Sequence, residues 1–129
     1  MKRQTNRREE ILENIQKIVV KVGTSTLTNE DGSLNIEKIK KIVSELSNLS
    51  DKGYDVVLVT SGAVGAGMGK LNMTERPKTL SEKQALASVG QVALTHLYQL
   101  LFQEYGKIIG QILLTRGDFS DRRRYLNAR

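Results

Sequence analysis

The chain has 129 residues, of which 39% are apolar, 26% are charged and one is proline. This composition predicts a single soluble globular domain and excludes intrinsic disorder and a Pro-rich or collagen-like scaffold. No uncharged apolar run approaches the roughly 20 residues of a membrane span, and no cysteine is present to form a disulfide or a thiolate metal site. We therefore expect a cytoplasmic protein that does not bind a membrane.

The formal net charge is +6, and the excess of basic residues lies at the two ends of the chain. A nucleic-acid-binding face combines basic side chains with aromatic residues that stack on bases, and the run Arg122-Arg123-Arg124-Tyr125 is the only candidate. A solvated helix face, or a patch covered by sequence outside this chain, explains this run better. Nucleic acid is therefore not an expected partner.

The first third of the chain predicts a strand, a loop and a helix. Residues 17–22 form a β-branched run typical of a buried strand, and a loop is expected over 23–26. Asn35 can cap a helix in which apolar residues recur at spacings of three and four over 36–49. Gly53 is a suitable C-terminal stop for this helix.

The next segments repeat the pattern of strand, loop and helix. Residues 55–60 predict a second buried strand, which runs into a glycine-rich loop over 61–69. Ser81 and Gln84 have the spacing of a capping box, and the longest predicted helix extends from there to about Glu104. Both predicted strands therefore end in a glycine-containing loop.

The C-terminal third predicts a strand and the start of a helix. Residues 108–114 form a third apolar run, and a helix is expected after Asp118. Near-continuous apolar strands that alternate with helices indicate a parallel sheet covered on both faces. The predicted fold class is α/β, a three-layer α-β-α sandwich with a mainly parallel sheet. Residues 1–16 are expected to be an extension, helical over 7–16, before the domain at 17–129.

In such sheets ligands bind beyond the carboxyl ends of the strands, where both glycine-containing loops fall. Lys21 ends the first strand beside Gly23, Thr24 and Ser25, whose backbone N–H groups can approach an anion closely. A lysine that extends from a strand end into water is the competing interpretation of Lys21. The second loop favours phosphate handling over that alternative.

The second loop begins with Ser61, Gly62 and Ala63. In a parallel sheet these residues lie at the same edge as Lys21. A hydroxyl, backbone N–H groups and a helix N-terminus would then face one cleft together with the ammonium group.

Commoner phosphate motifs do not fit this chain. The pair Gly69-Lys70 lacks the earlier glycine and the following Ser or Thr of a Walker A loop. The pair Gly65 and Gly67 lacks the third glycine of a dinucleotide fingerprint. These glycines can equally serve a turn or close helix packing. His96 is the only histidine, and a structural role is the favoured interpretation.

Five motifs in series carry a resemblance to a known family. They are Lys21-Val22-Gly23-Thr24-Ser25, Val59-Thr60-Ser61-Gly62-Ala63, Lys83-Gln84-Ala85-Leu86-Ala87 with Val89-Gly90-Gln91, Gly110-Gln111 through Leu113-Leu114-Thr115-Arg116, and Arg124-Tyr125-Leu126-Asn127-Ala128-Arg129. Their order over residues 17–129 resembles the glutamate 5-kinase family of amino-acid kinases. The resemblance implies the amino-acid kinase fold, represented here by its N-terminal half.

The resemblance also implies an activity. The family transfers the terminal phosphoryl group of ATP to the side-chain carboxylate of L-glutamate, which is the first step of proline biosynthesis. By motif, Lys21 is similar to the catalytic lysine that contacts phosphate, and Gly23, Thr24 and Ser25 are similar to the ATP phosphate loop. The loop that holds glutamate is represented by Ser61, Gly62 and Ala63. Mg²⁺ would be carried by the nucleotide, with no metal ligands on the protein.

The family's kinase domain continues beyond the last motif of this chain. We therefore expect an incomplete kinase domain that is inactive alone and belongs to a homo-oligomer at full length. Two other readings stay open: a sibling kinase similar to aspartate kinase, and a non-catalytic module that binds an anion or assembles with a partner. An RNA-binding fragment that uses residues 122–124 ranks last.

Overall fold

The computed structural model describes residues 14–129. Within these residues the sheet has two parallel strands, β1 (Lys17–Val22) and β2 (Asp55–Thr60), and both have the predicted bounds. The predicted α/β class with a parallel sheet is confirmed. Most of the predicted helix over 7–16 lies outside the described residues, and residues 14–16 form a turn and irregular backbone.

Helix α3 (Ile36–Asp51) connects the two parallel strands and begins where the sequence predicts. The Asn35 side chain accepts a hydrogen bond from the Lys38 N–H at 3.0 Å, which satisfies one of the free donors of the first turn. Gly53 follows the helix with a φ of +91°, a left-handed conformation that glycine adopts without strain. The predicted cap and stop are both confirmed.

The two segments predicted as loops contain helices. After β1 the chain forms the single turn α2 (Thr24–Leu27), and after β2 it forms α4 (Ala63–Lys70). Glycine lowers helix propensity but allows two backbones to approach. A β-carbon at Gly67 would lie 2.1 Å from the carbonyl oxygen of Leu86, so α4 packs directly on the backbone of the next helix. The predicted loop over 61–69 is therefore wrong beyond its first two residues.

Helix α5 (Leu80–Gln103) is the longest element, as predicted, but its cap differs. The Thr79 hydroxyl accepts from the Glu82 N–H at 3.2 Å, and the Glu82 carboxylate accepts from the Thr79 N–H at 3.0 Å. Ser81 and Gln84 have the same spacing but lie inside the helix. The predicted capping box is wrong by two residues because Thr79, with extended backbone, already supplies the cap.

Helix α5 is also long and apolar enough to cross a membrane by length and composition alone, with a mean hydropathy of 1.2. Its sequence contradicts the expectation that no such run is present. In the structure one face of α5 lies in the core of the domain, and 33% of its most apolar window is buried. The buried residues of this face are Leu86, Gly90, Leu94, Tyr98 and Leu101.

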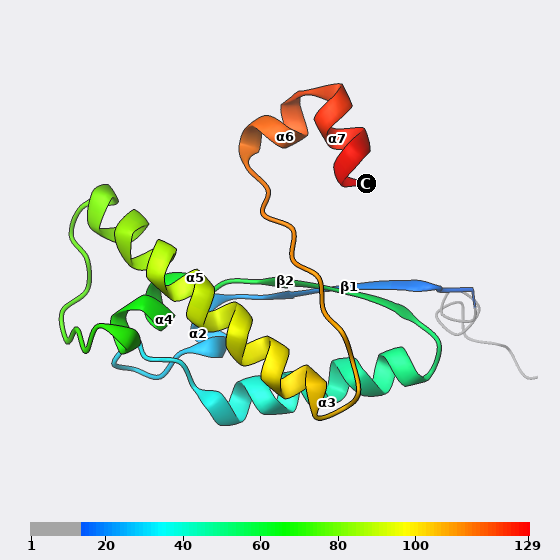
Figure 1. Ribbon diagram of the computed structural model, residues 1–129, viewed down its shortest axis with the longest axis horizontal. Helices are drawn as coiled ribbons and strands as arrows, with labels where there is room; N and C mark the ends of the chain where they lie inside the picture. The colour runs from blue at the N-terminus through cyan, green and yellow to red at the C-terminus, as the bar shows by residue number, and fades with distance from the viewer. Residues whose placement is uncertain (1–13) are drawn as a thin grey trace, which may run out of the picture.

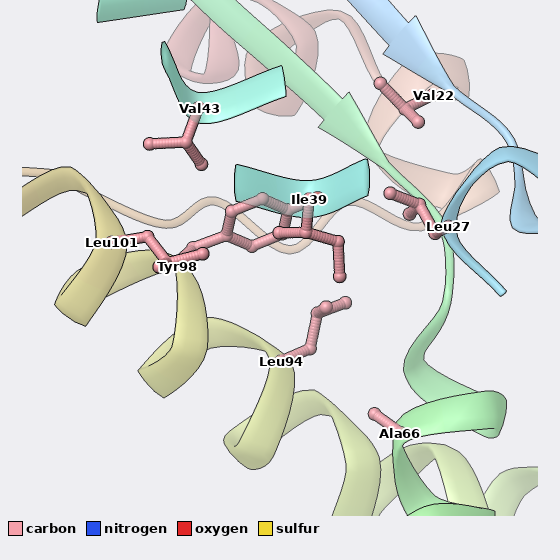
Figure 2. Close-up of a cluster of buried hydrophobic side chains, with 8 residues drawn as sticks. All are labelled: Val22, Leu27, Ile39, Val43, Ala66, Leu94, Tyr98 and Leu101. Carbon is pink, nitrogen blue, oxygen red and sulfur yellow. The ribbon is translucent and has the colours of Figure 1, made fainter. Parts of the chain in front are cut away.

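The core lies between the helices and one face of the sheet. Figure 2 shows side chains of β1, α2, α3, α4 and α5 meeting there, with Ile39 of α3 opposite Leu94 and Tyr98 of α5. The other face of the sheet is exposed, with Val19 at 62%. In Figure 1 α3 lies below the strands and α5 crosses in front of them, and both helices contribute to the one core cluster. Within the described residues, this second face of the sheet is therefore uncovered.

The predicted third strand is also absent from the described part of the chain. Residues 108–114 form an irregular segment between α5 and α6 (Arg116–Ser120), and Ile108 is fully exposed. A strand forms only when a neighbouring strand takes its backbone hydrogen bonds, and this segment pairs with neither β1 nor β2. The chain ends in α7 (Arg122–Ala128), which with α6 lies across the sheet from α3 in Figure 1.

Candidate active site at the carboxyl ends of the strands

The carboxyl ends of the two strands are level with each other. In the parallel register Val22 pairs with Thr60, and the Ser61 N–H donates to the carbonyl oxygen of Val22 at 3.0 Å. Helix α2 begins just after β1, and α4 begins just after β2. The turns that follow both strands therefore lie at one edge of the sheet, as predicted.

A cavity of about 230 Å³ opens at this edge. Its lining combines residues of the α2 turn, the end of β2, the start of α4 and one residue of α5. These residues are Thr24, Thr60, Ser61, Gly62, Ala63, Val64, Gly65 and Gln91. Thr24 from the predicted phosphate loop is thus brought together with all three residues of the predicted glutamate loop.

Lys21, Gly23 and Ser25 are not among the residues that line the cavity. Lys21 pairs with Val59 in the sheet, and its side chain is exposed on the same face as Val19. None of the ion pairs within residues 14–129 involves Lys21. The structure therefore places Lys21 near the predicted edge of the sheet but outside the cavity. Within the described residues, no carboxylate forms an ion pair with its ammonium group.

The backbone conformation requires glycine at position 62 but not at position 23. Gly62 has a φ of +106°, so glycine is needed there for the turn into α4. Gly23 has an ordinary φ of −82°, and nothing lies within 4 Å of the position its β-carbon would occupy. Neither backbone conformation nor packing within the described residues requires glycine at position 23.

The first turn of α4 faces the cavity through Ala63, Val64 and Gly65. No side chain caps this helix at Gly62. The N–H groups at the start of a helix carry a partial positive charge, which attracts anions. The cavity therefore offers hydroxyl groups and a helix N-terminus, a donor set suited to a carboxylate or a phosphate.

Four lining residues were not predicted as site residues: Thr60, Val64, Gly65 and Gln91. Thr60 is the polar residue that closes an apolar strand, and this position could have identified it. Gln91 lies on α5, where its Nε2 donates to Thr95 Oγ1 at 3.3 Å. It follows Gly90, whose lack of a side chain brings α5 against α4. A long-range helix contact of this kind has no local signal in the sequence.

His96 lies on α5 away from this cavity. It is exposed and lines a second cavity of about 580 Å³ between α5 and residues 111–113. The other lining residues are Ser88, Gln91, Val92, Thr95, Gln99, Gln111 and Leu113. No Lys, Arg, Asp or Glu side chain lines this space.

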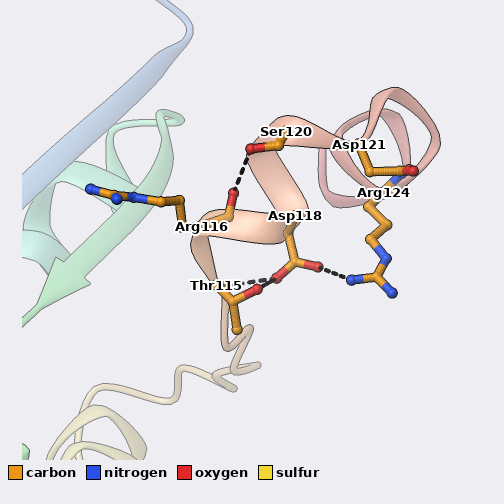
Figure 3. Close-up of polar contacts among 6 residues, drawn as sticks. All are labelled: Thr115, Arg116, Asp118, Ser120, Asp121 and Arg124. Carbon is orange, nitrogen blue, oxygen red and sulfur yellow. Dashed lines mark hydrogen bonds and ion pairs between the residues drawn. The ribbon is translucent and has the colours of Figure 1, made fainter.

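The basic run at the C-terminal end is partly neutralised by acidic neighbours. Figure 3 shows Asp118 of α6 between Thr115 and Arg124, with its carboxylate 3.8 Å from the Arg124 guanidinium. The hydrogen bond from the Thr115 hydroxyl is the main cause that lowers the pKa of Asp118, and Arg124 adds to it. Asp121 also accepts from the Arg124 N–H at 2.8 Å. These contacts fit the interpretation of a solvated helix surface.

Metal ligands are not gathered at the site. Among the described residues no group of three or more His, Asp or Glu side chains could hold a metal ion. The first cavity has hydroxyl, amide and backbone donors and acceptors in its lining but no carboxylate. Mg²⁺ prefers carboxylate and phosphate oxygens, so these residues do not form a site for it by themselves.

Known proteins resemble this chain closely. It is 65% identical over 111 residues to a glutamate 5-kinase of Caldanaerobacter subterraneus subsp. tengcongensis, and the aligned residues cover 86% of this chain and 30% of that protein. It is 54% identical over 122 residues to a glutamate 5-kinase of Clostridium acetobutylicum, and the aligned residues cover 95% of this chain and 46% of that protein. The chain thus spans less than half the length of these relatives. Residues 16–129 match the sequence profile of the amino acid kinase family, to which this chain belongs.

Proposed function

We propose that this chain supplies the phosphate loop and the acceptor loop of a glutamate 5-kinase. The reaction would transfer the terminal phosphoryl group of ATP to the side-chain carboxylate of L-glutamate. The observation that carries the proposal is the cavity shared by Thr24 and the Ser61–Ala63 segment at the strand ends. The names of the similar proteins, glutamate 5-kinases at 65% and 54% identity, support the choice of substrate.

The chemistry of a carboxylate acceptor agrees with the side chains at this edge. A carboxylate is ionised at neutral pH and needs no general base to become a nucleophile. The protein must instead bring two anions together and stabilise the charge of the transferring group. Hydroxyl groups, the uncapped start of α4 and a nearby lysine can do this.

We assign the acceptor side to Ser61, Gly62 and Ala63. They line the cavity, and the Ser61 hydroxyl and the N–H groups of Gly62 and Ala63 can bind the carboxylate of glutamate at the positive end of α4. In this position the nucleophilic oxygen is oriented by fixed backbone donors. A donor that is already in place does not have to reorganise during the transfer.

We assign the nucleotide side to Lys21, Gly23, Thr24 and Ser25. The open space around Gly23 lets a phosphate approach the backbone closely. The exposed side chain of Lys21 is long enough to turn from the sheet face toward a phosphate at the strand end. When ATP is bound, Mg²⁺ would arrive on its phosphate oxygens. We place the enzyme in the cytoplasm, as a homo-oligomer that serves proline biosynthesis.

A trapping assay tests the proposed reaction. Hydroxylamine converts an acyl phosphate into a hydroxamate, so ATP, Mg²⁺ and L-glutamate should give glutamyl hydroxamate. The assay is run on this chain and on the longest product of the reading frame that encodes it, with L-aspartate as the control acceptor. We expect turnover of glutamate, and not of aspartate, by the longest product. Turnover of aspartate alone would assign a sibling kinase, and turnover of neither would reject the proposal.

A further inference from the structure

Tyr98 joins the middle of α5 to the end of β2 by a partly buried hydrogen bond. The residue is 4% exposed, and its hydroxyl lies 2.9 Å from Thr60 Oγ1. Figure 2 shows its ring among the core side chains between α5 and α3. A buried hydroxyl that meets a strand end next to a cavity can affect that cavity without touching a ligand.

The direction of this hydrogen bond follows from the other contact of Thr60. Thr60 Oγ1 also lies 3.0 Å from the carbonyl oxygen of Ser61, which can only accept. A threonine hydroxyl has one hydrogen, and that hydrogen is donated to Ser61. Tyr98 must therefore donate to Thr60. The result is a chain of two hydrogen bonds from Tyr98 through Thr60 to the Ser61 carbonyl.

The Ser61 carbonyl belongs to the peptide group that leads into α4. The described residues contain no cis peptide bond, so the Gly62 N–H points opposite to the Ser61 carbonyl. Holding the carbonyl therefore also sets the direction of the Gly62 N–H. Gly62 itself has a φ of +106° and lines the cavity. Glycine resists rotation of this peptide group less than other residues do.

We propose that Tyr98 is a positioning residue for the candidate active site. Through Thr60 it fixes the Ser61–Gly62 peptide group, and so the direction of the Gly62 N–H at the residue that lines the cavity. The identity of that acceptor rests on the proposed function. The series of hydrogen bonds from Tyr98 to the Ser61 carbonyl, and its effect on the Ser61–Gly62 peptide group, do not rest on the proposed function.

The test removes one oxygen atom. Tyr98→Phe keeps the ring in the core, and Tyr105→Phe is the matched control at a tyrosine that is 43% exposed. Both are made in the longest product of the reading frame and labelled with ¹⁵N-glycine. We expect the Gly62 amide resonance to move in Tyr98→Phe and not in Tyr105→Phe. An unmoved Gly62 resonance in a folded Tyr98→Phe protein overturns the proposal.

Substitutions at Thr60 provide a second route that does not depend on the core ring. Thr60→Val removes the bridging hydroxyl, whereas Thr60→Ser keeps it. We expect Thr60→Val to move the Gly62 resonance as Tyr98→Phe does, and Thr60→Ser to leave it near its original position. Equal shifts in both Thr60 variants would mean that the hydroxyl chain does not hold the peptide group.

Kinetics add a readout that a purely structural role would not change. Loss of one hydrogen bond of about 1 kcal/mol corresponds to a change of about fivefold in an equilibrium constant. We therefore expect Tyr98→Phe to raise the KM for L-glutamate about fivefold while the KM for ATP stays constant. An equal rise in both KM values contradicts the proposal. If the unsubstituted enzyme lacks kinase activity, the proposed function fails, and the resonance of Gly62 still decides the role of Tyr98.

Discussion

Gly90 of α5 lies directly against the carbonyl oxygen of Ala63 at the start of α4. A β-carbon at position 90 would stand 1.6 Å from that oxygen and 2.4 Å from the Gly67 nitrogen, so the two helices meet backbone to backbone. This contact sets the start of α4 beside Gln91, and both line the same cavity. A packing contact therefore also shapes the candidate site.

Substitution at Gly90 should show the effect of this contact on the free energy of unfolding apart from the effect of helix propensity. Gly90→Ala must push α4 and α5 apart, because backbone atoms cannot move aside as a side chain does, and we expect a loss of more than about 2 kcal/mol in the free energy of unfolding. Gly69→Ala is the matched control, since its β-carbon would meet nothing within 4 Å. Because alanine favours a helix more than glycine does, Gly69→Ala in α4 should raise the free energy of unfolding by about 0.5–1 kcal/mol. Urea unfolding measures both, and equal effects would contradict the packing argument.

The glycines also show why part of the fold could be predicted and part could not. The strands and α3 follow from local features: apolar runs, helical spacing and the cap at Asn35. Helix α4 has a weak local signal because Gly65 and Gly67 are poor helix formers. It packs backbone to backbone against Gly90, which is remote in the sequence. The sequence left a turn or close helix packing open for these glycines, and the structure confirms close helix packing for Gly67, whereas Gly65 lies against the backbone of Gly32 in a loop.

The site was predicted to a similar extent. Motifs after each strand predicted that Thr24 and Ser61 lie at one edge of the sheet, because residues that follow parallel strands gather there, and both residues line the cavity. Gln91 reaches the cavity only through the contact between α4 and α5. Residues 108–114 were predicted to form a strand because their apolar composition is a local signal. Strand formation requires a neighbouring backbone, and the described residues offer this run none.

The capping box of α5 predicts a dependence of stability on pH. Hydrogen bonds from the Thr79 and Lys78 N–H groups lower the pKa of Glu82 from its ordinary value of 4.5. A lowered pKa in the folded state means that the contribution of Glu82 is present above pH 4.5. It is lost as the pH falls through the folded pKa. In Glu82→Gln the free energy of unfolding should therefore fall less steeply as the pH is lowered into the acid range.

Urea unfolding between pH 2 and 7 measures this effect. Glu45→Gln on α3 is the control, because Glu45 is exposed and takes part in no capping box. Thr79→Ala removes the other half of the box and should cost about 1 kcal/mol at neutral pH. Parallel acid limbs in the original protein and Glu82→Gln would show that the carboxylate does not stabilise α5.

Gly23 should matter for ligand binding more than for folding. Alanine fits at this position without a clash, so Gly23→Ala should change the free energy of unfolding by about 1 kcal/mol or less. A methyl group there would keep a phosphate away from the backbone, and we expect a rise of about tenfold in the KM for ATP. Steady-state kinetics on the longest product of the reading frame measures it. An unchanged KM for ATP in Gly23→Ala would place the phosphates elsewhere.

Lys21 and Lys17 provide the sharpest comparison, because both are exposed lysines on the same face of β1. Only Lys21 lies near the carboxyl end, so only Lys21 should contact the transferring phosphoryl group. Lys21→Met should lower kcat about a hundredfold or more, as loss of one donor to transition-state charge does. Lys17→Met should leave kcat unchanged. Both variants should unfold within about 0.5 kcal/mol of the original protein, because neither side chain is buried. Equal kcat values for the two variants would remove Lys21 from the reaction and leave it as a solvated strand residue.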